Sequence, residues 1–136
     1  MSTATVLTNP IVTVNTVDLS NQCTSATINH TVEALEATAF GDTARKFVGG
    51  LQNNEVTLTM YMSYASAETY ATLNGLVGTT TTITIKPATG SNSATNPLIT
   101  VTGCYLETLP VINGSMGELS VVDVTFTGGA LTKVVI

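Results

Sequence analysis

The chain of 136 residues has no tryptophan, one histidine, two cysteines and only four lysines and arginines. Cys23 and Cys104 lack the close spacing and the histidine companions of a zinc site, so we expect two buried thiols. No stretch approaches the ~20 consecutive apolar residues of a membrane helix, and the N-terminus lacks the basic start of a signal peptide. These absences predict a protein that is made in the cytoplasm and does not enter a membrane.

Positive charge is scarce. Nine aspartates and glutamates against four lysines and arginines leave a net charge of -5, and the sequence pI is about 4.4. Stable complexes with nucleic acid depend on neutralisation of phosphates by lysine and arginine. The sequence therefore argues against sequence-specific binding of DNA or RNA and leaves electrostatic repulsion from DNA open.

Residues suited to catalysis are also few. The single histidine, His30, is in phase with apolar strand positions, which favours a satisfied structural side chain over a catalytic base. The carboxylates are dispersed and form no cluster typical of a calcium or magnesium site. The glycine pairs at 49–50 and 128–129 lack the lysine and helix of a phosphate-binding loop. We expect no catalytic residue, no cofactor site and no metal site, and hence not an enzyme.

Threonine makes up about a fifth of the residues, and with valine and isoleucine it produces a β-branched composition that favours strands. Residues 55–62 alternate strictly, with apolar side chains at the even positions and Glu55, Thr57, Thr59 and Tyr61 at the odd ones. The same alternation predicts about seven or eight strands. The other candidate segments are residues 9–19, 24–32, 34–40, 81–86, 98–109 and 119–128.

One segment has helical spacing. Tyr70, Leu73 and Val77 recur at helical intervals after Ser66, a good N-cap residue, which predicts a short helix near residues 66–77. The fold class is therefore mainly β, with two packed antiparallel sheets forming a sandwich or barrel and this helix flanking one side. The expected division is an N-terminal arm at 1–10, one β domain at 11–130 and a strand-like C-terminal tail at 131–136.

A β protein without a chemical site works through its surfaces. The two ends of the chain are apolar and strand-like, in "ATVLTNPIVTV" and "GGALTKVVI". Such segments are aggregation hazards on a monomer, and their natural use is strand pairing with a neighbouring copy. The polar loops at 86–97 and 113–117 are read as long surface connections.

The ordered combination of segments resembles a known family. The strand before "EATAFGDTARKFVGGL", the alternating "EVTLTMYM", the helix ending "LNGLVG", the strand ending "IKP", the loop ending "SATNP" and the final "GELSVVDVTFTGG" are similar to the small major tail, or tail tube, proteins of long-tailed bacteriophages. The likeness spans roughly residues 11–130. It implies two packed β-sheets with one flanking helix, six-membered rings of identical subunits, and stacking of these rings into a hollow tube for the genome.

The functional hypothesis is thus a structural virion protein, most simply the tail tube subunit. The alternative is a capsid decoration protein of the same type of fold. A free carbohydrate-binding module is less favoured, because such modules display aromatic platforms and this chain has no tryptophan. Its four tyrosines are read as packing residues: Tyr61, Tyr64, Tyr70 and Tyr105.

The resemblance implies no catalytic or cofactor residues, but it suggests that the loop at 41–50 makes ring or stacking contacts. The candidate interface residues there are Asp42, Arg45, Lys46 and Phe47. We expect Arg45 or Lys46 to pair with a carboxylate of a neighbouring copy, with Glu33, Glu36 and Glu118 as candidates.

A channel for DNA should not bind its cargo, so its lining should be acidic and hydroxyl-rich. The candidate lumen-facing residues are Glu55, Thr57, Thr59 and Asp123. The expected partners are further copies of the chain and other virion proteins, and the expected location is the virion, in the tail or alternatively on the capsid surface.

Overall fold

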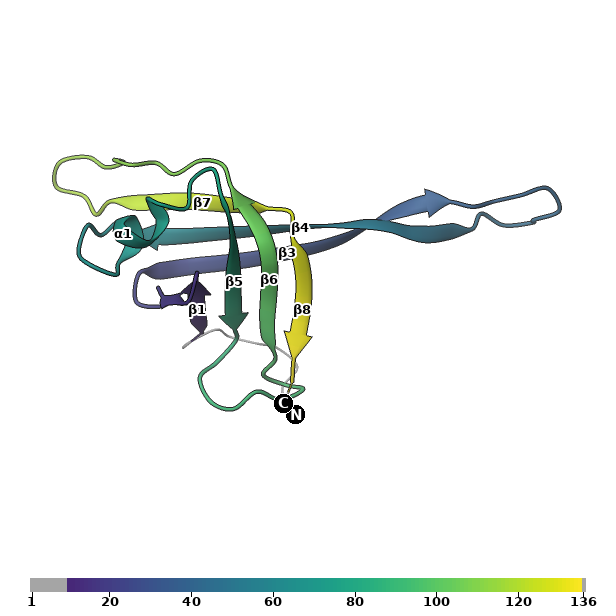
Figure 1. Ribbon diagram of the computed structural model, residues 1–136, viewed down its shortest axis with the longest axis horizontal. Helices are drawn as coiled ribbons and strands as arrows, with labels where there is room; N and C mark the ends of the chain where they lie inside the picture. The colour runs from purple at the N-terminus through teal and green to yellow at the C-terminus, as the bar shows by residue number, and fades with distance from the viewer. Residues whose placement is uncertain (1–9, 136) are drawn as a thin grey trace.

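The computed structural model describes residues 10–135, which form eight strands and one short helix (Figure 1). The expected N-terminal arm lies almost wholly outside the described residues. The elements are β1 (Ile11–Val14), β2 (Val17–Asp18), β3 (Cys23–Glu36), β4 (Phe47–Tyr61), α1 (Thr69–Leu73), β5 (Thr80–Lys86), β6 (Leu98–Leu106), β7 (Val121–Thr127) and β8 (Ala130–Val134).

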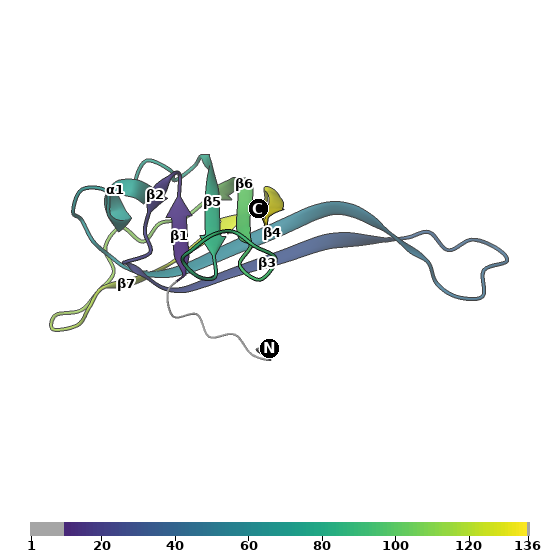
Figure 2. The same ribbon diagram turned by 90° about the horizontal axis from the view of Figure 1, so that it is seen from below.

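All eight strands belong to one antiparallel sheet in the order β2-β1-β5-β6-β7-β4-β3, and β8 pairs with β6 off this path. The sheet folds over itself, so that β3, β4 and β7 form one layer and β1, β5, β6 and β8 run across it in the other (Figures 1 and 2). The mainly β fold with packed layers and one short helix is confirmed. Because the two layers are continuous through β6 and β7, the sheet is single, and it does not close into a barrel.

The core lies between the two layers. In β7 and in the inner half of β4, residues 54–61, every second residue is buried and the intervening ones face outward, as the alternating sequence predicts. The same holds for the inner positions of β1, β5 and β6. The buried apolar residues are Val12, Val14, Leu19, Val56, Leu58, Met60, Leu73, Ile83, Val101, Cys104, Leu106, Leu109, Val122, Val124 and Phe126.

The segment from 24 to 61 differs from expectation. The strands predicted at 24–32 and 34–40 are replaced by the single long strand β3, which ends at Glu36, so that residues 37–40 lie outside it. β4 begins at Phe47 instead of near Glu55. The two strands pair from Cys23 with Met60 to Glu36 with Phe47. A register shift between Val32 and Ala34 breaks the alternation without ending the ladder, so the sequence pattern looks interrupted where the strand continues.

The helix is shorter than expected. Residues 69–73 are α-helical, and Ser66 does not cap them, since the N-cap residue is Glu68, which makes no side-chain cap bond. The Thr69 hydroxyl donates instead to the carbonyl of Tyr61. Leu73 is fully buried, so α1 closes one end of the space between the layers.

The C-terminal segment is a strand of the domain. Residues of β8 pair with β6 from Ala130 opposite Thr102 to Val134 opposite Leu98. The sequence suggested that this apolar tail is free to pair with a neighbouring copy, but it pairs with β6 of the same chain. The turn into β8 depends on Gly129, which has a φ of 87° and lies so close to β6 that a Cβ would meet the carbonyl oxygen of Thr102 at 2.6 Å.

Gly129→Ala should destabilise the fold more than Gly117→Ala. Both glycines have positive φ, so both variants suffer backbone strain of about 1–2 kcal/mol, but nothing lies within 4 Å of a Cβ at Gly117. Chemical denaturation followed by circular dichroism measures the difference. Equal losses of stability in the two variants would show that the close approach of β8 to β6 is not a constraint.

Candidate assembly interface

The most prominent surface feature is a two-stranded arm, residues 31–53, formed by the outer halves of β3 and β4. β4 pairs with β7 only from Glu55 to Tyr61, so the outer half of β4 has β3 as its single strand partner among the described residues. Both views show the arm projecting far beyond the two packed layers (Figures 1 and 2). We call residues 37–46 the tip of the arm.

The root of the arm is fixed by a buried polar side chain. Asn54 is fully buried, and its amide nitrogen donates to the carbonyl of Gly129 at 2.9 Å. Its side-chain oxygen bonds Nδ1 of His30. The side chain of His30 thus has a structural partner, as the sequence suggested, and it joins β3 to β4 where the arm leaves the body.

A bulge shapes the middle of the arm. Val32 pairs with Gln52, but Ala34 pairs with Gly49, so β4 has one more residue than β3 in this interval. A Cβ at Gly50 would lie 3.2 Å from the side chains of Glu33 and Leu35. The glycine pair at 49–50 therefore has a structural role, because the absence of side chains lets β3 and β4 stay in contact across the bulge.

The arm exposes large apolar side chains. Phe40 at the tip is 109% exposed and Leu51 is 82% exposed. An isolated two-stranded hairpin is marginally stable in water, and grouped exposed apolar residues mark interaction surfaces. Such a group of exposed apolar side chains is typical of a surface that contacts another protein. Its exposed apolar residues are Val32, Leu35, Phe40, Phe47, Val48 and Leu51.

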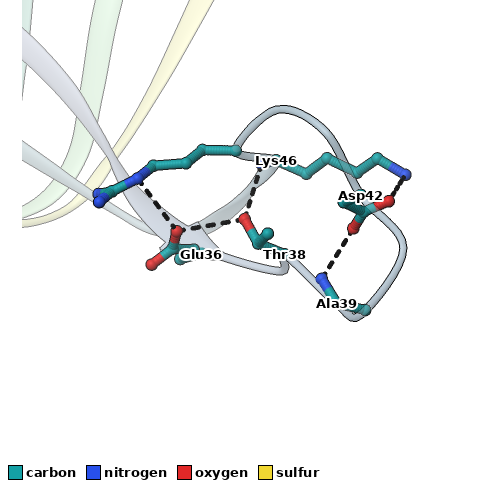
Figure 3. A network of polar contacts seen from close by, with 6 residues as sticks. Glu36, Thr38, Ala39, Asp42 and Lys46 are labelled. Carbon is teal, nitrogen blue, oxygen red and sulfur yellow. Dashed lines mark hydrogen bonds and ion pairs between the residues drawn. The ribbon is translucent and has the colours of Figure 1, made fainter.

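Polar contacts order the tip (Figure 3). The backbone N–H of Ala39 donates to Oδ2 of Asp42 at 2.7 Å, and the N–H of Lys46 donates to the Thr38 hydroxyl at 3.0 Å. That hydroxyl in turn donates to Oε2 of Glu36 at 3.1 Å. The tip is thus a defined turn despite its exposure.

The two tip cations have partners within the chain. Lys46 Nζ lies 2.9 Å from Oδ1 of Asp42, and Arg45 Nε lies 3.9 Å from Oε2 of Glu36. Of the predicted interface residues, Asp42 and Lys46 pair with each other, Arg45 pairs with Glu36 instead, and Phe47 begins β4 and is half-exposed. Pairing of these cations with a neighbouring copy stays a prediction. The Arg45 contact is long and uses one of five guanidinium donors, which leaves capacity for a further carboxylate.

A second surface is the outer face of the layer formed by β3, β4 and β7. The sequence-predicted lumen residues lie together on it: Thr59 is opposite Asp123 and donates to its Oδ1 at 2.7 Å, and Thr57 is opposite Thr125. We call this surface the polar face. Tyr61 and Val121 share this face at its end. The polar residues of this face on the body are Ser25, Thr27, Asn29, Glu55, Thr57, Thr59, Asp123, Thr125 and Thr127.

The polar face carries no positive charge. The body portions of its three strands, residues 23–31, 53–61 and 121–127, contain neither lysine nor arginine. Apart from Val121, it presents hydroxyl, amide and carboxylate groups. Such a surface is hydrated and repels polyanions weakly, within the roughly 8–10 Å over which salt screens charge.

The polar layer ends in an open edge. β3 is the last strand of the sheet and pairs only with β4 among the described residues. Its fourteen residues make it a long edge strand. At the other side of the layer, β7 pairs with β6 only through Phe126 and Thr127, so the remainder of that edge has no strand partner in the described chain.

Sequence reasoning missed the loop between β6 and β7, residues 107–120. Only residues 113–117 were predicted to be a connection, and the predicted strands 98–109 and 119–128 covered the two ends of this loop. The loop exposes Ile112, Met116 and Leu119 at 85%, 102% and 77%. Val111, Ile112 and Met116 do not alternate, so no strand pattern included them, and Leu119 was assigned to the strand predicted at 119–128. The loop lies at the end of the molecule opposite the arm (Figures 1 and 2).

The described residues 10–135 offer little else for chemistry. They contain no group of three histidine, cysteine or carboxylate residues placed to hold a metal ion, and none of their helices is long and apolar enough to cross a membrane.

Burial raises the pKa of both thiols, with Cys104 in the core and Cys23 half-buried. Cys23 lines a mostly apolar cleft of about 360 Å³ between β3 and the β1–β5 side.

The fold is that of chains in phage-like tail and injection assemblies. No protein-family model matches the sequence, and no curated protein matches it. The chain is similar to one in the anti-feeding prophage cap, a tube terminating cap, with a TM-score of 0.70 and 14% identity over 100% of this chain and 94% of that one. This and the following likenesses confirm, at the level of fold, the resemblance to tail tube proteins.

Two further structures have the same architecture. A chain in the sheath/tube terminator of the PVC extracellular contractile injection system, in its extended state, has a TM-score of 0.69 and 15% identity over 97% of each chain. A chain in the virion of the native gene transfer agent particle has a TM-score of 0.65 and 12% identity over 96% of this chain and 98% of that one.

The tip should respond to acid through Asp42. The Ala39 N–H and then Lys46 hold the pKa of this carboxyl below its ordinary value, since both favour the charged form. Its contribution to tip order is therefore present above the ordinary pKa and is lost as the pH falls through the lowered one. In an NMR titration the Ala39 amide should report a midpoint below that of an ordinary aspartate.

The variant Lys46→Met separates the two causes. Its midpoint should rise only partway toward the ordinary value, because the Ala39 donor remains. A wild-type midpoint at or above the ordinary aspartate value would contradict the tip structure.

Proposed function

We propose that this protein is the structural subunit of a phage-like tail tube, which assembles into rings that stack around a DNA channel. Support comes from the fold and from two features of the layer formed by β3, β4 and β7. One is the open outer edge of β3, and the other is a polar face free of lysine and arginine. The proposal includes a location in the virion tail after synthesis in a host cytoplasm, a role without catalysis or cofactor, and contact with other virion proteins.

The observation that carries this proposal is the edge of β3. Alternate residues of an edge strand direct their N–H and C=O groups away from the sheet, and a long unpaired edge is a template for pairing with another chain. Soluble proteins protect such edges by charge, proline or short length. Residues 24–32 of β3 contain no lysine, arginine, carboxylate or proline, so this edge is open to a neighbouring copy.

Ring geometry follows from which edges meet. Pairing of β3 with β3 of a second copy would be isologous and would close a two-fold dimer. Pairing of β3 with the β7 side of the next copy is heterologous and repeats around a ring, which six copies would close. The three-stranded layers of all copies then form one continuous wall, and their polar faces share the same side of it.

The composition of that side suits a DNA conduit. Each contact of a lysine or arginine with phosphate releases counterions and retards movement of the duplex. Threonine hydroxyls with Glu55 and Asp123 hydrate the wall without holding the DNA. Residues Glu55, Thr57, Thr59 and Asp123 are accordingly assigned to the lumen in this proposal, and the cation-bearing arm is assigned to contacts between subunits.

A second candidate function is an end piece of such a tube. It is favoured by two of the similar structures, which are of a sheath/tube terminator and of a tube terminating cap. An end piece would use the same ring contacts but would expose one axial surface to a different protein. Capsid decoration, the other structural reading, would place the polar face toward solvent or shell without enclosing a channel.

Electron microscopy of the purified chain at micromolar concentration tests the proposal. We expect rings and stacked tubes with a central channel, and an averaged map should place the polar face on the channel wall. Rings that do not stack would favour the end piece. A wall lined by the arm or by Lys86 and Lys133, or a chain that binds to capsid shells without enclosing a channel, would contradict the conduit.

A further inference from the structure

The two largest groups of exposed apolar side chains lie at opposite ends of the molecule. One is on the arm, where Phe40, Phe47, Val48 and Leu51 are exposed. The other is on the β6–β7 loop, where Val111, Ile112, Met116 and Leu119 are exposed. Figures 1 and 2 show the arm and the loop pointing away from the body in opposite directions. A surface with two separate apolar patches is suited to two simultaneous partners.

The β6–β7 loop has a defined shape. The Tyr64 hydroxyl donates to the carbonyl of Val111 at 2.7 Å, and the Asn113 side chain donates to the carbonyl of Val121 at 2.7 Å. The Ser120 hydroxyl donates to the carbonyl of Asn113. Tyr64 is itself packed on Tyr70, with ring centroids 5.1 Å apart. A loop ordered in this way loses little entropy on binding, which favours a docking role.

The charges at the two ends are complementary. The tip contains Asp42, Arg45 and Lys46, a net charge of +1 that the adjacent Glu36 offsets through its contact with Arg45, and it holds two of the four cations of the chain. The loop contains Glu107 and Glu118 and no cation, a net charge of -2. Because the rest of the chain is acidic, the tip is the one part of the arm that a carboxylate-bearing surface would attract.

We propose that the tip of the arm docks on the β6–β7 loop of a second copy, head to tail. Phe40 packs among the apolar side chains around Ile112, and Arg45 adds Glu118 of that copy to its existing Glu36 contact. This inference rests on the proposed function and names the surfaces that join one ring to the next. The contact is heterologous, so it repeats without closing and extends a stack in one direction.

Complementary variants test the docking. Phe40→Asp damages the donor surface and Ile112→Asp damages the acceptor surface; both side chains are largely or fully exposed, so neither change disturbs the core. Each variant alone should form rings with loss of stacking. Ala94→Asp, an exposed position in the 87–97 loop, adds the same charge away from both surfaces and should stack like the wild type.

A mixture of the two variants separates head-to-tail docking from other arrangements. Rings with Phe40→Asp keep an intact loop and rings with Ile112→Asp keep an intact arm, so the mixture should contain pairs of rings that do not grow further. Electron microscopy counts single, paired and stacked rings. Absence of pairs, or normal stacking by the Ile112→Asp rings, would overturn the docking.

Failure of the proposed function gives a different result. If the wild type forms no rings, the same mixture is followed by sedimentation, where docking predicts heterodimers of the two variants and self-associated chains of the wild type. Monomers in both samples would overturn the docking as well.

A charge swap tests the Arg45–Glu118 contact. In either assay, Arg45→Glu should weaken the association, and the double variant Arg45→Glu with Glu118→Arg should restore it. A double variant that associates as weakly as the single variant would overturn this contact.

Discussion

The backbone of β3 imposes the constraint on which the rest of the structure depends. Every backbone N–H and C=O group requires a hydrogen-bond partner, and a strand at the edge of a sheet leaves half of these groups to water or to another chain. β3 has fourteen residues and a single partner, β4. A monomeric protein rarely leaves such an edge unprotected, and this is the basis of the proposed pairing of β3 with a neighbouring copy.

The remaining features are consistent with that constraint. Folding of one continuous sheet into two layers buries the apolar faces of β4 and β7 against β1, β5 and β6, and leaves a hydroxyl-rich face on the layer that contains the open edge. The arm extends the same two strands beyond the body, where their apolar side chains have no core to join. The Asn54 side chain ties the root of the arm to the body through its hydrogen bonds to the Gly129 carbonyl and to His30.

The sequence was most informative where alternation was strict. Residues 55–62 predicted both the buried face of β4 and the outward positions of Glu55, Thr57 and Thr59, because a period of two fixes which side chains share a face. It failed where local pattern and long-range pairing conflict. The bulge at Gly50 disguised the outer half of β4, and the pairing of β8 with β6 could not be inferred from a terminal segment alone.

The candidate site was recovered only in part for similar reasons. The tip residues Asp42, Arg45 and Lys46 were recognisable as scarce cations beside a carboxylate, but their pairing within the turn depends on the geometry of the hairpin. Residues 110–118 of the β6–β7 loop had no periodic signal, and the loop is shaped by hydrogen bonds from the Tyr64 and Asn113 side chains to the carbonyls of Val111 and Val121. Surfaces defined by such tertiary contacts cannot be predicted from the pattern of a single sequence.

Hydrogen exchange along β3 tests the central claim most directly. Below the concentration at which the protein assembles, alternate amides between residues 24 and 32 should exchange rapidly, because their N–H groups face water, while the intervening amides bonded to β4 are protected. In the assembled particle both sets should be protected, because a neighbouring copy pairs with the open edge. If the alternate amides exchange as rapidly in the particle as in the free chain, β3 is not a subunit contact and the ring must be built in another way.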